Sequence, residues 1–474
     1  MIAFILTVLY ASMALLSPSA LPPAITALHV ANILGGLAIF AIALNIVNVN
    51  IWAIPETYLV FGVLVTTIAS TLATGWFGGA VDVFLGFFPI VCCYYFITIS
   101  SRSISRLRIL VSALTLVALF IVLQGVFDDW RGDFLSPYLE SELMTDTIVY
   151  RHRGLGVLND PNDLAQFLTM MIPLLWLRWK EGNYFGNAVF TVLPAMVLLF
   201  GVYETHSRGG IISLIAVLLF GLKDRLGLVK SSVLAAAALT VTVVLNTSGG
   251  RGMNEDDGGR VAAWVLGLEL FRAHPIFGVG VGRFAEYNDT FLTAHNSYVL
   301  GLAELGLQGY FFWIGMLVSG WIGLRSLISM SKLAPETTAA RSGLRWTPPR
   351  RAPLRAANNL NFAVADGGYS RAVVSRPWEL SPADTDRVID TPEEVAHTAR
   401  IFQVALVGLL TSSFFLSRTY STSVYVLLGM AVALRETSAT PVVIRIWPLV
   451  RKICYTVAGS ILFLYLFIRI RGVS

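Results

Sequence analysis

Residues 107–127 read LRILVSALTLVALFIVLQGVF, and Arg108 is the only charged residue in this stretch. An apolar stretch of about 20 residues is long enough to cross a lipid bilayer as a helix. Comparable stretches recur along the 474-residue chain. They are long and do not alternate between apolar and polar residues, which excludes a transmembrane β-barrel. The sequence therefore predicts an all-α fold, a polytopic transmembrane helical protein.

The composition supports a membrane protein. Charged residues make up 13% of the chain and apolar residues 55%. A soluble domain has about a quarter charged residues, so the composition argues against a cytoplasmic enzyme, a disordered protein and a coiled coil. Membrane lipid is the expected surrounding, and no nucleic-acid partner is expected. The cysteines, Cys92, Cys93 and Cys454, lie in apolar runs without metal-ligand spacing, so we expect buried thiols.

We expect about 12 of 13 apolar segments to cross the membrane, because a thirteenth crossing would leave Arg469 and Arg471 on the extracytoplasmic side. The segments are 2–16, 24–46, 57–74, 78–99, 107–127, 162–178, 186–203, 210–222, 229–246, 297–326, 401–417, 421–434 and 452–469.

The loops on the two sides of the quoted run differ in charge. The preceding loop contains Arg102, Arg106 and Arg108, whereas residues 128–153 contain three Arg against six Asp and Glu. Residues 247–294 are also acidic, with four Arg against six Asp and Glu. Because basic loops stay in the cytoplasm, the two acidic loops are predicted to be extracytoplasmic.

This topology divides the chain into seven parts. They are N-terminal transmembrane helices at 1–127, an extracytoplasmic loop at 128–161, central transmembrane helices at 162–246, a large extracytoplasmic catalytic loop with short interfacial helices at 247–296, a transmembrane helix at 297–328, a cytoplasmic insert at 331–399 and C-terminal transmembrane helices at 400–474. The insert lacks hydrophobic periodicity, so we expect it to be disordered.

The centres of the predicted spans carry almost no ionisable residues. Such residues are costly in a membrane and mark proton relays and transport pathways. Their scarcity counts against a proton-coupled transporter and leaves the extracytoplasmic loops as the place where chemistry can occur.

Residues 205–210, THSRGG, form a predicted extracytoplasmic turn that opens a span. Ser207 suits the N-cap position, and Gly209 lets the backbone come close to a ligand. A helix N-terminus favours an anion, and Arg208 adds a forked donor that matches phosphate oxygens. The same residues also fit a tight turn whose arginine reaches a lipid headgroup.

The apolar positions 261, 264, 265, 268 and 271 fall on one face of a helix, which predicts a helix at the outer membrane interface. Arg260 stands in its first turn, where the helix dipole disfavours a cation that lacks an anionic partner. That partner is either the substrate or the acidic run 255–257. The acidic run could also bind a metal, but a solvated acidic loop is the simpler interpretation.

His295 directly precedes a long span, and Asn296 or Ser297 can cap that helix. Arginines and a helix N-terminus disfavour the charged imidazolium, so a neutral His295 can act as a general base near pH 7. The alternative is a histidine that only caps the helix or binds a headgroup. Glu304, two turns into the span, either orients His295 or Arg208 or pairs structurally with an arginine.

Three further segments are of interest. Residues 151–153 are basic in an acidic loop and help to attract a phosphate, Arg153 among them. Asp160 and Pro161 fit the start of a helix. Residues 274–284, HPIFGVGVGRF, predict a glycine-rich bend that includes Arg283, and the absence of a preceding strand argues against a dinucleotide fingerprint.

Together these residues resemble the O-antigen ligase and polymerase family of bacterial membrane glycan enzymes. The resemblance rests on the order of Arg208 in a Ser-Arg-Gly turn, Gly259-Arg260 with Trp264 four residues later, the glycine-rich stretch 274–282, His295-Asn296 and the sequence AELG at 303–306. It is strongest over residues 150–325.

The resemblance implies a metal-independent, inverting glycosyltransferase without a cofactor, in the bacterial inner membrane with its active site facing the periplasm. Such an enzyme serves lipopolysaccharide or exopolysaccharide biosynthesis and moves a preassembled glycan from undecaprenyl diphosphate to an acceptor. The acceptor is lipid A–core in ligases, another carrier-linked glycan in polymerases and a protein in some relatives. The family's essential outer arginines and histidine match Arg208, Arg260 and His295.

The residue types agree with that chemistry. Two arginines and a helix N-terminus can stabilise a diphosphate leaving group by preorganised electrostatics, and His295 is the predicted general base. The residues expected to support the site are Glu304, Asn296, Ser207, Gly209, Arg153 and Arg283.

Two other functions remain open at the level of the sequence. A flippase or exporter of polyprenyl-linked glycan would need a central cationic cavity, which the uncharged span centres do not favour. A non-catalytic assembly component of a polysaccharide export system would act through the insert at 331–399.

Overall fold

The computed structural model describes residues 1–16, 30–44, 51–144, 147–244, 257–289, 291–333, 390–437 and 444–470. Most of the predicted insert at 331–399 therefore lies outside the described residues, as does most of the acidic run 255–257.

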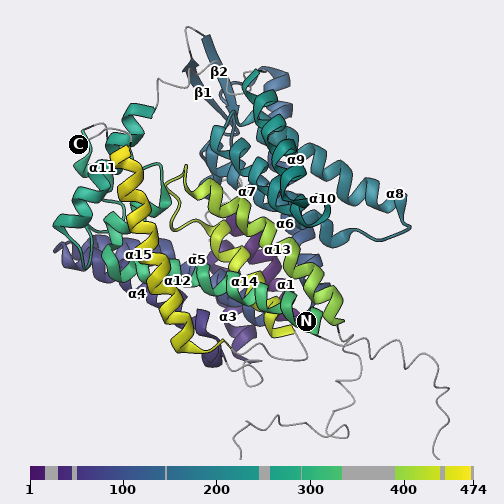
Figure 1. The fold of residues 1–474 in the computed structure, drawn as a ribbon, viewed down its shortest axis with the longest axis horizontal. Helices are drawn as coiled ribbons and strands as arrows, with labels where there is room; N and C mark the ends of the chain where they lie inside the picture. Colours follow the sequence, from purple (N-terminus) through teal and green to yellow (C-terminus); the bar gives the residue numbers. More distant parts are fainter. Residues whose placement is uncertain are drawn as a thin grey trace, which may run out of the picture.

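Helices account for most of the described chain (Figure 1). The N-terminal helices are α1 (Ile2–Leu16), α3 (Val30–Ala43), α4 (Pro55–Ala73), α5 (Phe77–Ser100) and α6 (Ile104–Arg131). The central helices are α7 (Pro161–Leu174), α8 (Tyr184–Asn187), α9 (Leu193–Glu204), α10 (Arg208–Val244) and α11 (Asp257–Ala273). The remaining helices are α12 (Ser297–Leu333), α13 (Pro392–Ser413), α14 (Thr422–Thr437) and α15 (Ile446–Ile470).

The helical membrane architecture predicted from the sequence is confirmed. Within the described ranges, seven helical stretches are long and apolar enough to cross a membrane, and α1 and α3 are shorter apolar helices. The expected number of about 12 spans is not confirmed. The predicted segments 210–222 and 229–246 correspond to two helices within α10 that meet at a kink at Gly227 (φ 78°, ψ 161°), the second of them described up to Val244.

Helix α13 starts earlier than predicted. Thr391 caps it by accepting a hydrogen bond from the Glu394 N–H (3.2 Å), and Pro392 occupies the first turn. The predicted segment began at residue 401 because the first turns of α13 are polar. Residues 392–399, which we expected in the disordered insert, therefore form a helix.

The structure also contains a β-hairpin that an all-α fold does not include. Strands β1 (Leu139–Met144) and β2 (Thr147–His152) pair antiparallel, with Leu139 opposite His152. The hairpin lies in the segment 128–161, which we predicted only as an extracytoplasmic loop. In Figure 1 it stands at the top of the view, on the same side as α11. We call this side the hairpin end.

Helix α12 is at the centre of the packing. It contacts α4, α11, α13, α14 and α15, and α15 runs obliquely beside it in Figure 1. Trp313 of α12 is fully buried, and its indole N–H donates a hydrogen bond to the Thr419 carbonyl (2.9 Å). Much of α15 is exposed, and Cys454 on this helix is exposed too, contrary to our expectation of a buried thiol.

The predicted cytoplasmic loops meet at the opposite end of the helices, which we call the basic end. The Ile104 N–H donates to the Asp390 carboxylate (2.9 Å), and Arg108 pairs with Glu394 (2.7 Å). Arg108 also donates to the Leu177 carbonyl (2.8 Å). These contacts join three segments that the alternation of charge assigned to one side of the membrane.

A buried ion pair links α4 to α14. The Arg435 guanidinium binds both carboxylate oxygens of Glu56 (2.6 and 2.9 Å), and the Ser319 hydroxyl of α12 donates to the same carboxylate (2.6 Å). Both charged side chains are almost completely buried. Removing one partner of such a pair leaves an uncompensated charge in a dry environment.

We expect Arg435→Met to lower the free energy of unfolding by about 3–5 kcal/mol, because the Glu56 carboxylate stays buried without its cation. The double variant Glu56→Gln/Arg435→Met should recover part of this loss. Glu286→Gln, which breaks an exposed pair with Arg283, should change stability by about 1 kcal/mol or less. Unfolding curves of the detergent-solubilised variants measure these changes, and equal losses for Arg435→Met and Glu286→Gln would contradict this view of the pair.

Candidate functional site

The turn between α9 and α10 has the structure predicted for it. Helix α10 starts at Arg208, and the Ser207 hydroxyl accepts a hydrogen bond from the Gly210 N–H (3.1 Å), as an N-cap does. Gly209 lies against Phe415, since a Cβ at this position would come within 2.8 Å of the phenylalanine side chain. Arg208 is half-buried beside this contact. The sequence therefore brings the backbone of this turn close to the loop that contains Phe415.

The start of α7 lies next to this turn. The Ser207 hydroxyl donates to the Asn162 side-chain oxygen (2.7 Å). Asp160 caps α7 by accepting from the Asn162 N–H (2.7 Å), as predicted. Arg151 of the hairpin is buried and donates from Nε to the Thr205 carbonyl (3.0 Å). The hairpin, the start of α7 and the Arg208 turn are thus one hydrogen-bonded unit.

Arg418 links this unit to the segment that contains His295. It lies in the loop between α13 and α14, and its guanidinium forms an ion pair with Asp163 in the first turn of α7. Its backbone N–H donates to the Ser297 hydroxyl (2.9 Å). Ser297 is the first residue of α12 and follows His295 by two positions. The Arg418 side chain stays 38% exposed, so its charge remains accessible at the hairpin end.

Helix α11 also contacts the segment that contains His295. The Trp264 indole N–H donates to the Ala294 carbonyl (2.8 Å), the residue directly before His295. Arg260 lies one turn earlier on α11 and is half-buried. The buried face of α11, which packs against α12 and α15, includes Trp264 and Leu268. The predicted helix therefore exists, with this apolar face turned toward the protein.

The backbone of His295 is held in an unusual conformation. Its φ is 46°, in the left-handed region, and Asn296 caps α12 by accepting from the Tyr298 N–H (2.9 Å). Among the described non-glycine residues, His206, Phe291 and His295 have positive φ. Such a conformation costs about 1–3 kcal/mol and persists only where the surroundings enforce it, often at functional sites. One of the three is His295, and another, His206, lies two residues before Arg208.

Glu304 holds a neighbouring bend. Its carboxylate accepts hydrogen bonds from the Gly282 N–H (3.0 Å) and the Tyr420 hydroxyl (3.2 Å). Helix α12 breaks two residues later at Gly306 (φ 62°). Of the roles considered for Glu304, the structure supports a structural one, but its partners are backbone N–H groups and a tyrosine instead of an arginine.

Two expected supporting arginines have local partners at the edge of the site. Arg153 donates from Nε to the Pro137 carbonyl (3.1 Å). Arg283 forms an ion pair with Glu286 (2.8 Å), and this hydrogen-bonded carboxylate raises the pKa of Arg283. Within the ranges that the structure describes, no three His, Cys, Asp or Glu side chains are grouped as a metal site would require.

Arg418 and Asp163 did not stand out in the sequence. Arg418 is a single arginine in a short loop that the charge pattern predicts to be extracytoplasmic, and Asp163 fits an ordinary position at a helix start. The available signal was that both lie at predicted outer span ends, where the few charges are concentrated. Their pairing across more than two hundred residues of sequence required the structure.

His152 is a buried histidine behind the site. Among the residues that the structure describes, neither ring nitrogen has a hydrogen-bond partner, and Nε2 is 3.8 Å from the Glu204 carboxylate. Burial lowers the pKa of His152 below its usual value, an effect that Asp129 partly offsets and that His206 adds to. The folded protein therefore favours the neutral imidazole.

Comparison with protein families places the main candidates in one matched region. Residues 193–314 match the family model described as O-antigen ligase. The match runs from α9 into α12 and includes Arg208, Arg260, His295 and Glu304. No curated protein matches the chain. The resemblance seen in the sequence is confirmed, and it supports a glycosyltransferase-type function for this membrane protein.

The glycine-rich bend can be tested with a matched pair of variants. A Cβ at Gly278 (φ 72°) would lie 2.4 Å from the Glu304 backbone, whereas at Gly282 (φ 78°) it would meet nothing within 4 Å. Gly282→Ala should cost about 1–2 kcal/mol, the penalty of a left-handed alanine. Gly278→Ala should cost clearly more because the bend must also move. Thermal unfolding measures both, and similar losses would contradict the close approach of this bend to α12.

The pH dependence of stability tests the burial of His152. Some histidines have a lower pKa in the folded than in the unfolded protein. Such a histidine favours the folded state at pH values above its unfolded pKa of about 6.5, and this contribution to stability is lost as the pH falls below that value. We expect His152→Leu to weaken the loss of stability between neutral and acid pH. Unfolding free energies measured across this range provide the test, and an unchanged slope would show that His152 is not the group concerned.

Proposed function

We propose that this chain, which carries an O-antigen ligase domain over residues 193–314, transfers a preassembled glycan from an undecaprenyl diphosphate carrier to an acceptor hydroxyl. The main support for this proposal is the set of contacts around Arg418. They join the Arg208 turn, the start of α7 and the His295 segment at one end of the helices. A donor with a charged diphosphate and an attached sugar needs cations and a base close together.

Arg208 and Arg260 are proposed to bind the diphosphate. Arg208 begins α10, whose first-turn N–H groups add a positive helix end. Arg260 approaches from α11, which the Trp264–Ala294 hydrogen bond ties to the His295 segment. Arginine offers planar, bidentate contacts to phosphate oxygens. Donors that are already in place stabilise the charge that develops on a leaving group without reorganisation.

His295 is the proposed general base. The acceptor oxygen attacks C1 of the donor sugar, and its proton passes to the imidazole. The bond between C1 and the diphosphate oxygen breaks, and its electron pair leaves with the diphosphate. A single displacement of this kind inverts the configuration at C1. The enforced left-handed backbone of His295 supports a fixed position of the ring relative to the acceptor.

Arg418 is proposed as a positioning residue for this site. It bridges Asp163 and Ser297, so it fixes the distance between the Arg208 turn and the start of α12. Asp163 neutralises part of its charge, and the exposed part of the side chain adds to the positive surface at the hairpin end. The site then presents three arginines from separate elements to the donor.

The proposed location follows from the charge of the loops. The basic end contains the loops that the positive-inside rule assigns to the cytoplasm. The hairpin end then faces the periplasm, where nucleotide sugars are absent and an activated sugar arrives on a lipid carrier. The polyprenyl chain would lie along the lipid-facing helices beside the site.

We expect Arg208→Ala, Arg260→Ala and His295→Ala each to abolish glycan transfer while the protein still folds, because each removes a group that acts on the diphosphate or the acceptor. Carrier-linked glycan should accumulate. Arg272→Ala is a suitable control, since Arg272 is exposed in the last turn of the same helix as Arg260. Transfer in reconstituted vesicles is the measurement, and full activity of all three variants would exclude this site.

Arg418→Gln is expected to lower the turnover rate by roughly 10²-fold, the size of effect that a displacement of about 1 Å between reacting groups can have. Arg418→Lys should recover part of the rate because it keeps the cation opposite Asp163. Turnover and KM measured separately distinguish positioning from donor binding. Equal rates for the glutamine and lysine variants would indicate that the charge of Arg418 has no part in catalysis.

A further inference from the structure

A cavity of about 310 Å³ lies at the basic end, away from the proposed glycan site. Its walls come from the start of α6, from residues 175–178 that follow α7, and from α8 with the turn after it. Arg108, Arg178 and Lys180 all line it. The cavity therefore brings three positively charged residues to the end of the helices where the basic loops meet.

Neighbouring residues hold the side chain of Arg178 and the backbone of Lys180 in place. Arg178 donates to the Ser112 hydroxyl and lies over the Phe190 ring, with Cζ 5.1 Å from its centroid. The Asn187 side chain fixes the backbone of Lys180 by accepting from its N–H (2.9 Å) and donating to its carbonyl (2.7 Å). Asn187 is itself buried. The pocket is thus built by specific side-chain contacts.

The positive charge of the pocket is only partly balanced. Arg108 pairs with Glu394, whereas in the described part of the chain neither Arg178 nor Lys180 has an ion pair. Lys180 is exposed, and Arg178 is half-buried. An anion is the complementary ligand, and the two forked arginine donors fit the tetrahedral oxygens of a phosphate group.

The surroundings of the pocket indicate a lipid. The segment from residue 176 to residue 190 contains several exposed aromatic side chains, namely Trp176, Trp179, Tyr184, Phe185 and Phe190. Aromatic residues gather at the boundary between the hydrocarbon core and water. The Phe190 side also contains a π-helical turn, Ala188–Val192, and such turns occur frequently at functional sites.

We propose that this pocket binds the phosphate headgroup of an anionic glycerophospholipid from the surrounding leaflet. Basic pockets between transmembrane helices on the cytoplasmic side are suited to such headgroups. The acyl chains would extend past the exposed aromatic residues into the bilayer. This site uses none of the residues assigned to glycan transfer.

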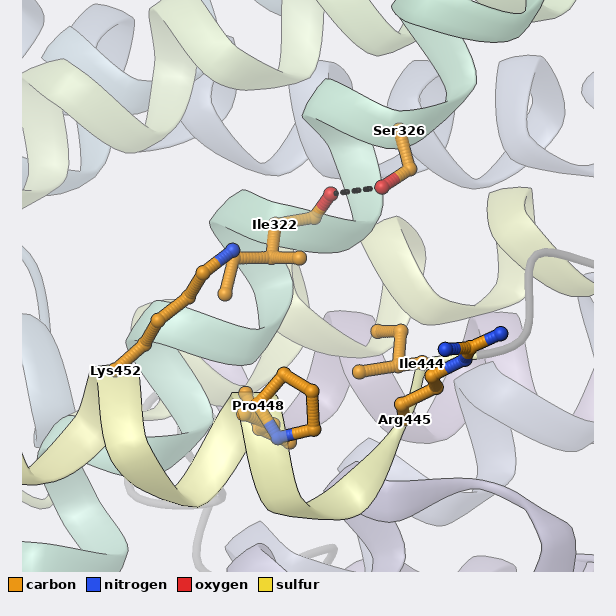
Figure 2. A pocket seen from close by; sticks show the side chains of 7 residues that line it. Ile322, Ser326, Ile444, Arg445, Pro448 and Lys452 are labelled. Carbon is orange, nitrogen blue, oxygen red and sulfur yellow. Dashed lines mark hydrogen bonds between the residues drawn. The ribbon is translucent and has the colours of Figure 1, made fainter.

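A second cavity at this end fits the same ligand less well. It lies between α12 and α15, measures about 130 Å³ and contains Arg445 and Lys452. Figure 2 shows these two side chains on opposite sides of Pro448, so their charges do not converge. The Ser326 hydroxyl, drawn in the same view, already donates to the Ile322 carbonyl (2.9 Å).

Native mass spectrometry of the full chain in detergent, titrated with dioleoyl phosphatidylglycerol, tests the proposal. Wild-type protein should bind one lipid saturably, and Arg178→Gln/Lys180→Gln should weaken this binding roughly 10- to 30-fold through the loss of two cations. Arg225→Gln/Lys230→Gln removes the same charge from exposed positions on α10 and should bind like the wild type. Arg108 is kept because it also pairs with Glu394.

Three results would overturn the proposal. One is wild-type affinity in the Arg178→Gln/Lys180→Gln variant. Another is equally tight binding of dioleoyl phosphatidylcholine, which has no net charge. The third is displacement of the lipid by inorganic phosphate at equal concentration, which would assign the pocket to a free phosphate. If the double variant fails to fold, Lys180→Gln alone should show a weaker but measurable loss, because the Lys180 side chain is exposed.

Discussion

The ion pair between Arg418 and Asp163 is the interaction on which the candidate site depends. It connects the loop after α13 with the first turn of α7, and the backbone N–H of the same arginine binds the first residue of α12. A partly buried charged pair contributes little net stability unless further hydrogen bonds satisfy it. Here those hydrogen bonds also set the relative positions of three helix ends, so the pair specifies geometry.

The other constraint is close approach of backbone at the glycine-rich bend. Gly278 and Gly306 both have positive φ, and a Cβ at either would lie 2.4 Å from backbone atoms of the opposing segment. The Glu304 carboxylate binds the N–H groups of this bend from inside α12. A buried carboxylate is costly unless hydrogen bonds satisfy it. The bend therefore supplies the N–H groups that the buried carboxylate needs, and the carboxylate in turn holds the bend against α12. The bend lies in the segment that connects α11 to His295.

Long apolar runs and cap residues were sufficient to predict much of the helical frame. The Ser207 cap, the Asp160 cap and the amphipathic α11 all follow from local sequence, because each depends on residues within one or two turns. The hairpin at 139–152 and the early start of α13 did not follow, since polar residues hide both from a hydropathy pattern. The partnership of Asp163 with Arg418 joins distant segments, and no local pattern encodes it.

The sequence also separated the two ends of the molecule, because basic and acidic loops alternate along the chain. Contacts such as Arg108–Glu394 join the segments at the basic end. The hydrogen bonds of Ser207 and Ser297 join the segments at the hairpin end. We propose that one end serves glycan chemistry and that the other binds anionic lipid.

We propose that one site at the hairpin end holds the carrier diphosphate between the Arg208 turn and the His295 segment. An electron cryomicroscopy map of the full chain with bound undecaprenyl diphosphate-linked glycan tests it most directly. We expect diphosphate density in contact with Arg208 and Arg260, with the first sugar beside His295. Diphosphate density at the basic end, with no density near these three residues, would contradict it.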